Sequence, residues 1–213
     1  MLTIKTKKQA VAITHTLSNP EKMPCKGYSL PASECKTGSK LRLIAGSVCS
    51  DCYACKGCYQ FPVVKSALQK RLDSINHPLW IEAMAVNIKG NEFFRWHDSG
   101  DIQNEKHLKD IFKICENTPN TSHWLPTKEN AILKRVLKTH AIPENLNIRY
   151  SMPMVNDTPK PQIIGVTTST SVTTETQAFK NGTLCEAYTR DGICGDCRKC
   201  WNKEIKNVSY LMH

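Results

Sequence analysis

From residue 93 onward, short runs of β-branched and aromatic residues alternate with segments whose apolar residues recur at helical spacing. The runs read FFRW, HWL, IRYSM and IIGVTTS, and each ends in a polar or turn sequence. Two amphipathic helices are predicted between them, with apolar stripes at Leu108, Ile111, Phe112 and Cys115 and at Ile132, Leu133, Val136 and Leu137. The alternation predicts an α/β fold with a mainly parallel sheet, and the count falls short of the eight units of a complete barrel. We therefore expect a partial βα barrel or an open sheet, with Cys115 as a buried structural thiol.

Two further helices are predicted before this region. Pro62 suits a first helical turn, and Pro78 opens a second pattern. Each carries an apolar stripe at helical spacing, made of Val64, Leu68, Leu72 and Ile75 in the first and of Trp80, Met84 and Ile88 in the second. We expect both stripes to pack in the core.

The first 48 residues show little periodicity and contain several turn residues. They predict an irregular arm around the domain, with a short strand over residues 40–45, KLRLIA, that leads into a cysteine-rich loop. Because 213 residues suffice for one domain with its own core, we expect a single domain over residues 1–213. Its parts would be the arm (1–48), the cysteine loop with the βα core (49–180) and a cysteine-rich C-terminal segment (181–213).

The chain contains 11 cysteines, far more than packing requires, and most of them lie in two groups. In the first, GSVCSDCYACKGCY, a cysteine recurs at every third position, at Cys49, Cys52, Cys55 and Cys58. In the second, Cys185 precedes the CGDCRKC run of Cys194, Cys197 and Cys200. Cys35 is a further candidate ligand and Cys25 a weaker one. This spacing lets several thiolates converge on one metal ion or cluster.

The sequence favours metal ligands over disulfides. The N-terminus is polar and basic and lacks the apolar core of a signal peptide, and no run approaches the roughly 18 apolar residues of a membrane span. We therefore expect a cytoplasmic, reducing location and no membrane partner. Zinc usually takes two separated Cys-x2-Cys knuckles, whereas longer runs at this spacing are typical of 4Fe-4S ligation. An iron-sulfur cluster is favoured, zinc is the alternative, and both one shared cluster and two separate clusters are open.

Polar residues follow the predicted strands, where parallel folds gather their chemistry. His97, Asp98, Ser99 and Asp101 follow FFRW, and Lys128 follows HWLPT. We interpret His97, Asp98, Asp101 and Lys128 as candidate catalytic residues. The alternative is that Asp98 to Asp101 form a turn that caps the next helix, and that Lys128 with Glu129 is a solvated ion pair.

Five segments together resemble the gene product 88 family of phage proteins: MPCKGYSLPASECKTGSKL, GSVCSDCYACKGCY, FRWHDSGDIQ, WLPTKE and CGDCRKCWNKEIKNVSY. The resemblance covers nearly the whole chain, and HDSGD with CGDCRKCW makes it specific. It implies a bacteriophage origin, residence in the cytoplasm of an infected bacterium and no established activity. In the family pattern seven positions tend to be cysteine and are the expected metal ligands, namely Cys35, Cys49, Cys52, Cys185, Cys194, Cys197 and Cys200. Cys55 and Cys58 lie outside that pattern.

A looser resemblance is to the radical S-adenosylmethionine enzymes, whose partial βα barrels hold a 4Fe-4S cluster in the loop after the first strand. Cys52-Tyr53 and HDSGD are similar to motifs of that family and imply cofactor contacts by Tyr53 and Ser99. Those enzymes use Cys-x3-Cys-x2-Cys, a spacing absent from this chain. S-adenosylmethionine also needs an open iron, so a cluster with four cysteine ligands would exclude it.

Two functions follow as hypotheses. The first is a phage iron-sulfur protein that performs redox or cluster-assisted catalysis on an unidentified small molecule at the C-terminal rim of the partial barrel. The second rests on the net charge of +10 and the sequence pI of about 9.1, which suit a polyanionic partner. In that case the metal only stabilises a module that binds nucleic acid or a host protein.

Overall fold

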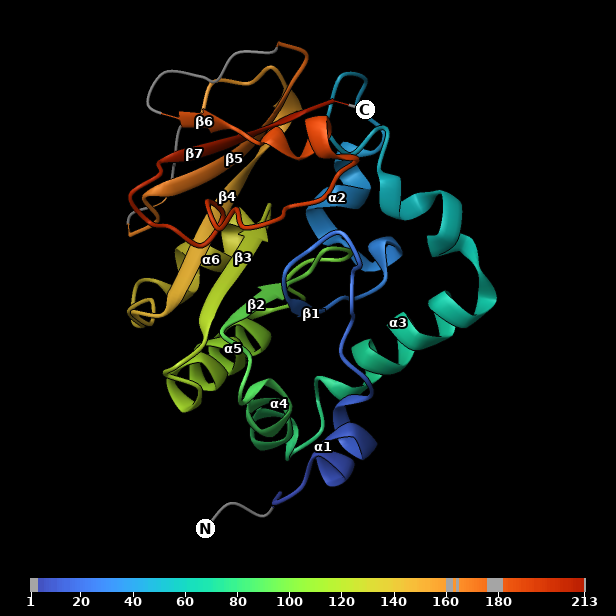
Figure 1. The fold of residues 1–213 in the computed structure, drawn as a ribbon, viewed down its shortest axis with the longest axis vertical. Coiled ribbons are helices and arrows are strands. Elements are labelled where there is room, and N and C mark those ends of the chain that lie inside the picture. Colours follow the sequence, from blue (N-terminus) through green and yellow to red (C-terminus); the bar gives the residue numbers. More distant parts are fainter. Residues whose placement is uncertain (1–3, 160–162, 164, 176–181, 213) are drawn as a thin grey trace.

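The computed structural model describes residues 4–159, 163, 165–175 and 182–212, and it contains one open sheet. Its seven strands lie in the order β1-β2-β3-β4-β5-β7-β6, and every neighbouring pair is parallel (Figure 1). The strands are β1 (Lys26–Tyr28), β2 (Phe93–Trp96), β3 (Ser122–Thr127), β4 (Leu146–Val155), β5 (Thr168–Thr173), β6 (Gly182–Leu184) and β7 (Asn207–Leu211). The predicted α/β class is confirmed, and the sheet is open rather than closed into a barrel.

The described helices include the four that the apolar stripes predict. The described α-helices are α1 (Lys7–Thr14), α2 (Lys36–Leu41), α3 (Pro62–Ser74), α4 (Trp80–Ile88), α5 (Glu105–Asn117) and α6 (Asn130–Val136). The predicted ones are α3 to α6. Pro62 occupies the first turn of α3, and the Asn104 side chain accepts a hydrogen bond from the His107 amide at the start of α5. None of the described helices is both long enough and apolar enough to cross a membrane.

Helices α4 and α5 cover one face of the sheet. Phe94 of β2 and His123 of β3 are register partners, so both side chains point to this face. Trp80 of α4 packs on Trp96 of β2 with ring centroids 6.3 Å apart, and Cys115 of α5 is fully buried there, as predicted. The main hydrophobic core therefore lies between these helices and β2 to β4.

The opposite face, which we call the second face, carries Arg95, Trp124 and Asn147 in register. It is covered by the segment after β6, which passes in front of the sheet in Figure 1. Trp201 of this segment packs edge-on against Trp124, with ring centroids 5.3 Å apart, and its indole donates to the Phe94 carbonyl at 3.1 Å.

Arg149 of β4 fixes the same segment to the sheet. Its guanidinium is fully buried and donates to five backbone carbonyls at 2.8–3.1 Å, those of Cys200, Ser169, Ile205, Lys199 and Asn202. Irregular backbone rarely lies against a sheet, because its carbonyls need partners there. Arg149 supplies these partners.

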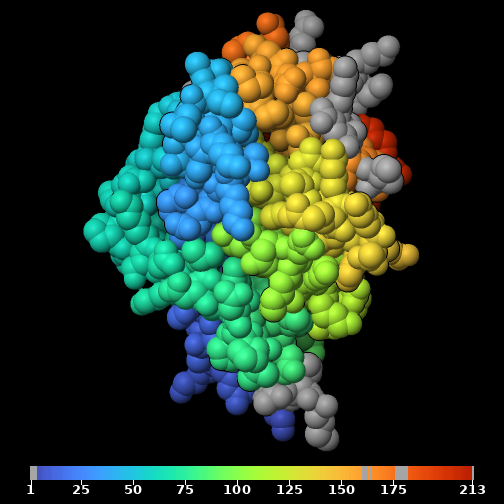
Figure 2. Space-filling model, turned by 180° about the vertical axis from the view of Figure 1, so that it is seen from behind, coloured from blue at the N-terminus to red at the C-terminus, as the bar shows by residue number. Residues whose placement is uncertain are grey.

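The N-terminal arm contains more regular structure than its sequence indicates. The predicted strand over residues 40–45 is wrong, because α2 ends at Leu41 and the chain then turns outward, leaving Leu43 88% exposed. The light-blue atoms near residue 40 accordingly lie on the surface in Figure 2. The strand of this region is instead β1, which approaches β2 so closely that a Cβ on Gly27 would lie 2.8 Å from the Arg95 carbonyl oxygen.

Two strand predictions also need adjustment. Strand β4 continues through the PMV sequence that was expected to end it, and β5 begins at Thr168, after most of the predicted IIGVTTS run. Of that run, residue 164 lies outside the described residues. The division into an arm, a βα core and a C-terminal segment stays a prediction.

Acid is expected to destabilise the fold through His123. Burial lowers the pKa of His123 to about 3, whereas an unfolded histidine has a pKa of about 6.5. Between these values the unfolded chain binds the extra proton, so stability falls as the pH falls below about 6.5. In His123→Gln, which can still bond Thr118 Oγ1, urea unfolding should depend on pH less steeply, by about 1.4 kcal/mol per pH unit. Parallel pH profiles for the two proteins would contradict this.

Replacing Arg149 should release the C-terminal segment. Arg149→Met removes one donor from each of five buried carbonyls, so we expect a loss of at least about 3 kcal/mol in the free energy of unfolding and faster proteolysis within residues 185–206. The matched control Arg135→Met removes an exposed ion pair with Glu105 and should cost at most about 1 kcal/mol. Equal losses in both variants would show that Arg149 does not hold the segment.

Candidate metal centres

All eleven cysteines are free thiols, and the structure gathers most of them into two places. We call Cys35, Cys49 and Cys52 the rim group, because they lie in the connection that follows the carboxyl end of β1. We call Cys185, Cys194, Cys197 and Cys200 the face group, because their segment covers the second face of the sheet. The seven cysteines that the family resemblance implies as ligands therefore form a set of three and a set of four.

Gly38 marks the meeting point of two sulfurs of the rim group. A Cβ on Gly38 would lie 3.6 Å from the Sγ of Cys49, 3.7 Å from the Sγ of Cys35 and 3.0 Å from the Cβ of Cys35. Two thiols that are 14 residues apart in sequence thus flank one side-chain-free position in α2. This position is a cradle that a methyl group would fill.

The electrostatics of the rim group are mixed. Burial raises the pKa of the Cys49 thiol, whereas the nearby Lys128 ammonium lowers it. Burial also raises the pKa of Cys35, and the carboxylate of Asp101 and the thiols of Cys52 and Cys49 add to that shift. Lys128, which was predicted as a catalytic residue, is therefore the cation that most lowers the pKa of Cys49.

Asp101 and Glu129 lie beside the rim group, but their oxygens are already bonded. Asp101 accepts from the Ile102 amide at 2.7 Å, from Thr127 Oγ1 at 2.5 Å and from the Lys128 amide at 2.9 Å. Burial raises the pKa of Asp101 to about 6 against these hydrogen bonds. Glu129 is buried and accepts two hydrogen bonds from Thr37, so it is not half of a solvated ion pair.

The HDSGD residues after β2 point in different directions. His97 has a left-handed backbone (φ 56°) and a buried ring whose Nδ1 lies 3.1 Å from the Tyr28 carbonyl oxygen. Burial lowers its pKa to about 4, so the ring is neutral at pH 7. The Ser99 hydroxyl donates to the Leu30 carbonyl at 2.9 Å. Both side chains thus make local contacts with β1 and the residues that follow it.

Asp98 differs from these two residues because it faces the cysteine loop. Its Oδ2 accepts from the Tyr59 hydroxyl at 2.7 Å, its backbone carbonyl accepts from the Tyr53 hydroxyl, and its Oδ1 is buried without a hydrogen-bond partner. Tyr53, the predicted cofactor contact, is 58% exposed although its hydroxyl end is held here. Asp98, Tyr53 and Tyr59 therefore join the loop after β2 to the cysteine loop.

Cys25, the weaker candidate ligand, lies beside the face group. The Cys194 amide donates to the Lys22 carbonyl at 2.9 Å, which brings Cys25 close to Cys194. Burial raises the pKa of Cys25 to about 12, Arg95 opposes this and the Cys194 thiol adds to it. Cys25 directly precedes β1, a strand too short for its pattern to predict, so only its presence in the family-like segment MPCKGY signalled it.

Cys200 is tied to its surroundings more closely than the rest of the face group. Its Sγ lies 3.1 Å from the Tyr210 hydroxyl, and its carbonyl accepts from Arg149 and Asn147. Burial raises the pKa of Cys200 to about 11, and the bond from Tyr210 opposes the shift. Strand β4, which is distant in sequence, and strand β7, which follows shortly after Cys200, thus set its position.

The donor chemistry of both groups suits a thiophilic centre. Thiolates without carboxylate or imidazole partners are the ligands of zinc and of iron-sulfur clusters. Within the described residues, no three or more His, Cys, Asp and Glu side chains converge tightly enough to hold a metal ion. The fit to a cluster therefore rests on the thiol donor sets and on the cradle at Gly38.

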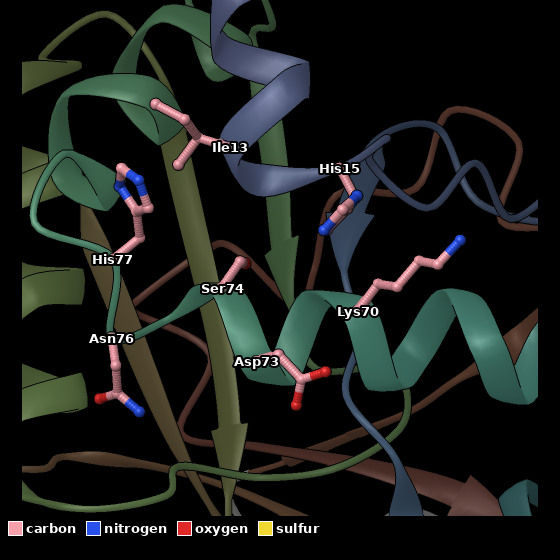
Figure 3. A pocket seen from close by; sticks show the side chains of 7 residues that line it. All are labelled: Ile13, His15, Lys70, Asp73, Ser74, Asn76 and His77. Carbon is pink, nitrogen blue, oxygen red and sulfur yellow. The ribbon is translucent and has the colours of Figure 1, made fainter.

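A surface pocket of about 440 Å³ lies elsewhere, between α1 and α3 (Figure 3). His15, Lys70, Asp73 and His77 line it, together with Ile13, Ser74 and Asn76. None of the cysteines or HDSGD residues borders it. The site residues predicted from the sequence therefore lie outside this pocket.

Comparison with known proteins identifies the family. A family model described as Gene product 88 matches residues 1–203, so the chain belongs to that family. Neither the curated proteins nor the solved structures contain a match. The resemblance drawn from HDSGD and CGDCRKCW is thereby confirmed, and it brings no established activity with it.

Thiol labelling can check these placements. In the reduced, metal-free protein, iodoacetamide should modify exposed Cys58 first and Cys115 at least about a hundredfold more slowly, because Cys115 reacts only when its surroundings open. Digestion and mass spectrometry at successive times would give both rates. Equal rates would mean that α5 does not bury Cys115.

Proposed function

We propose that this member of the gene product 88 family is an iron-sulfur protein with two separate centres, one for each cysteine group. The observation that carries the proposal is that the thiols associate within two groups: Cys35, Cys49 and Cys52 lie around α2 and affect one another's pKa, and the four cysteines of the face group do so in the segment after β6. A 4Fe-4S cluster has four irons, so four cysteines complete its ligation and three leave one iron for another ligand. The rim centre is then the site of chemistry.

The position of the rim group supports this division of roles. Carboxyl ends of parallel strands are where α/β proteins bind their substrates. The rim group follows β1, the Asp98 loop follows β2 and Lys128 follows β3, so all three connections meet at this edge. We assign Lys128 to hold negative charge beside Cys49, and Asp98 with Tyr53 to bind and orient a small molecule.

The face centre is assigned a structural or electron-carrying role. Its segment replaces a crossover helix and is held by Arg149 and Trp201. A metal bound by four ligands in such an irregular segment adds to the folding free energy. The rim geometry supports redox or cluster-assisted catalysis on a small molecule, and membership of the family supports a location in the cytoplasm of a phage-infected bacterium.

Anaerobic reconstitution of paired cysteine variants would test the two-centre proposal. Cys49→Ser with Cys52→Ser should remove about half of the bound iron and sulfide, Cys194→Ser with Cys197→Ser the other half, and all four together the whole. Cys115→Ser is the matched control and should keep the full content. Iron, sulfide and zinc analysis with visible spectra near 400 nm would measure each protein.

The possible outcomes separate the alternatives. Loss of all iron in either pair indicates one shared cluster, and stoichiometric zinc without sulfide refutes an iron-sulfur protein. Loss of rim iron in Cys55→Ser would make Cys55 the fourth rim ligand and close the open position. If metal-replete protein binds DNA or RNA in a salt-dependent way that survives Lys128→Ala, the binding module is favoured over an enzyme.

A further inference from the structure

Glu129 follows the carboxyl end of β3, and its carboxylate is buried and hydrogen-bonded within the protein. It is only 4% exposed, and both of its oxygens face Thr37. The Thr37 amide donates to Oε1 at 2.8 Å, and the Thr37 hydroxyl donates to Oε2 at 2.9 Å. Each oxygen of the carboxylate thus accepts a hydrogen bond from the same residue of α2.

Glu129 is itself held by the two loops next to it. Its amide donates to Thr127 Oγ1 at 3.0 Å, and that hydroxyl donates to Asp101 Oδ1 at 2.5 Å. Asp101 Oδ2 accepts from the Lys128 amide at 2.9 Å. One chain of hydrogen bonds therefore runs from the loop after β2, through the loop after β3, to α2.

The two flanking cysteines of the rim group are anchored in different ways. The segment of Cys49 is attached to β4, because the Val48 amide donates to the Pro153 carbonyl at 2.9 Å and the Val155 amide donates to the Gly46 carbonyl at 3.0 Å. Cys35 immediately precedes α2, a helix of six residues, and Thr37 and Gly38 follow within its first turn. The Thr37 bonds to Glu129 connect this turn to the sheet.

We propose that Glu129 is a positioning residue for the rim centre, which through Thr37 sets Cys35 opposite Cys49 across Gly38. The proposal rests on the proposed function, since it needs a rim centre to position. Glu129 acts as a fixed acceptor and not as a ligand. Loss of either hydrogen bond frees the turn that carries Cys35, while Cys49 stays in place on β4.

The chain offers a matched pair of variants at position 37. Thr37→Ser keeps both donors, whereas Thr37→Val keeps the shape and the amide but removes the hydroxyl donor. Glu129→Gln removes the charge that strengthens both bonds. We would measure these variants in a background of Cys194→Ser with Cys197→Ser, in which the rim centre is the source of bound iron.

The measurement is the rate at which a chelator removes iron under anaerobic conditions, together with the visible and paramagnetic spectra of the reduced centre. Supporting groups of this kind typically change metal affinity by about ten- to a hundredfold. We expect Thr37→Ser to match the parent, and Thr37→Val and Glu129→Gln to lose iron at least about tenfold faster with altered spectra. The double variant should be no faster than the worse single variant, because both changes break one connection.

A stability control separates positioning from general loss of folding. Ile114→Val removes a methyl group from the core under α5 and should lower the melting temperature without changing iron release. If Ile114→Val releases iron as fast as Glu129→Gln at equal stability loss, the positioning role is refuted. It is also refuted if the rim centre holds iron equally well in all position-37 and position-129 variants. A parent background that binds no iron at all refutes the proposed function, and the positioning role with it.

Discussion

Parallel pairing of the strands is the constraint on which the placement of the rim and face groups depends. It puts the connections after β1, β2 and β3 at one edge, which brings Cys35 and Cys49 together with Asp101 and Lys128. It also requires a crossover between β6 and β7, because two parallel neighbours cannot be joined by a hairpin. In this chain the crossover is the cysteine-rich segment, and Arg149 satisfies the carbonyls that a helix would have satisfied internally.

The elements that sequence predicted correctly are those whose burial leaves a local period. The stripe of Leu108, Ile111 and Phe112 predicts α5 because one face of that helix is buried and the other is exposed to solvent. FFRW predicts β2 for a similar reason, since β-branched and aromatic residues suit a buried pleated surface. The polar residues after FFRW lie at the carboxyl edge of the sheet, because all neighbouring strands are parallel.

The remaining parts depend on partners that are distant in sequence. KLRLIA has the composition of a strand, but β1 is the strand that pairs with β2. The six residues of KLRLIA do not show that another segment occupies this position in the sheet. Glu129 reads as half of an ion pair with Lys128, because its actual partner Thr37 lies 92 residues away. Cys25 was ranked low for the same reason, since its contact with the Cys194 segment exists only in the folded chain. Candidate ligands were thus predictable as residue types, and their grouping was not.

The position of β7 in the sheet has a consequence for the stability of the face group. Within the described residues, β6 pairs with β7 alone, at the outer side of the sheet. Its three residues are therefore held to the sheet through residues 207–211, which pair with β5 on their other side. Loss of the pairing between β5 and β7 would detach β6 as well and free both ends of the loop that carries Cys194 and Cys197. The face group accordingly depends on one strand, β7, whereas the rim group depends on strands β1 to β4.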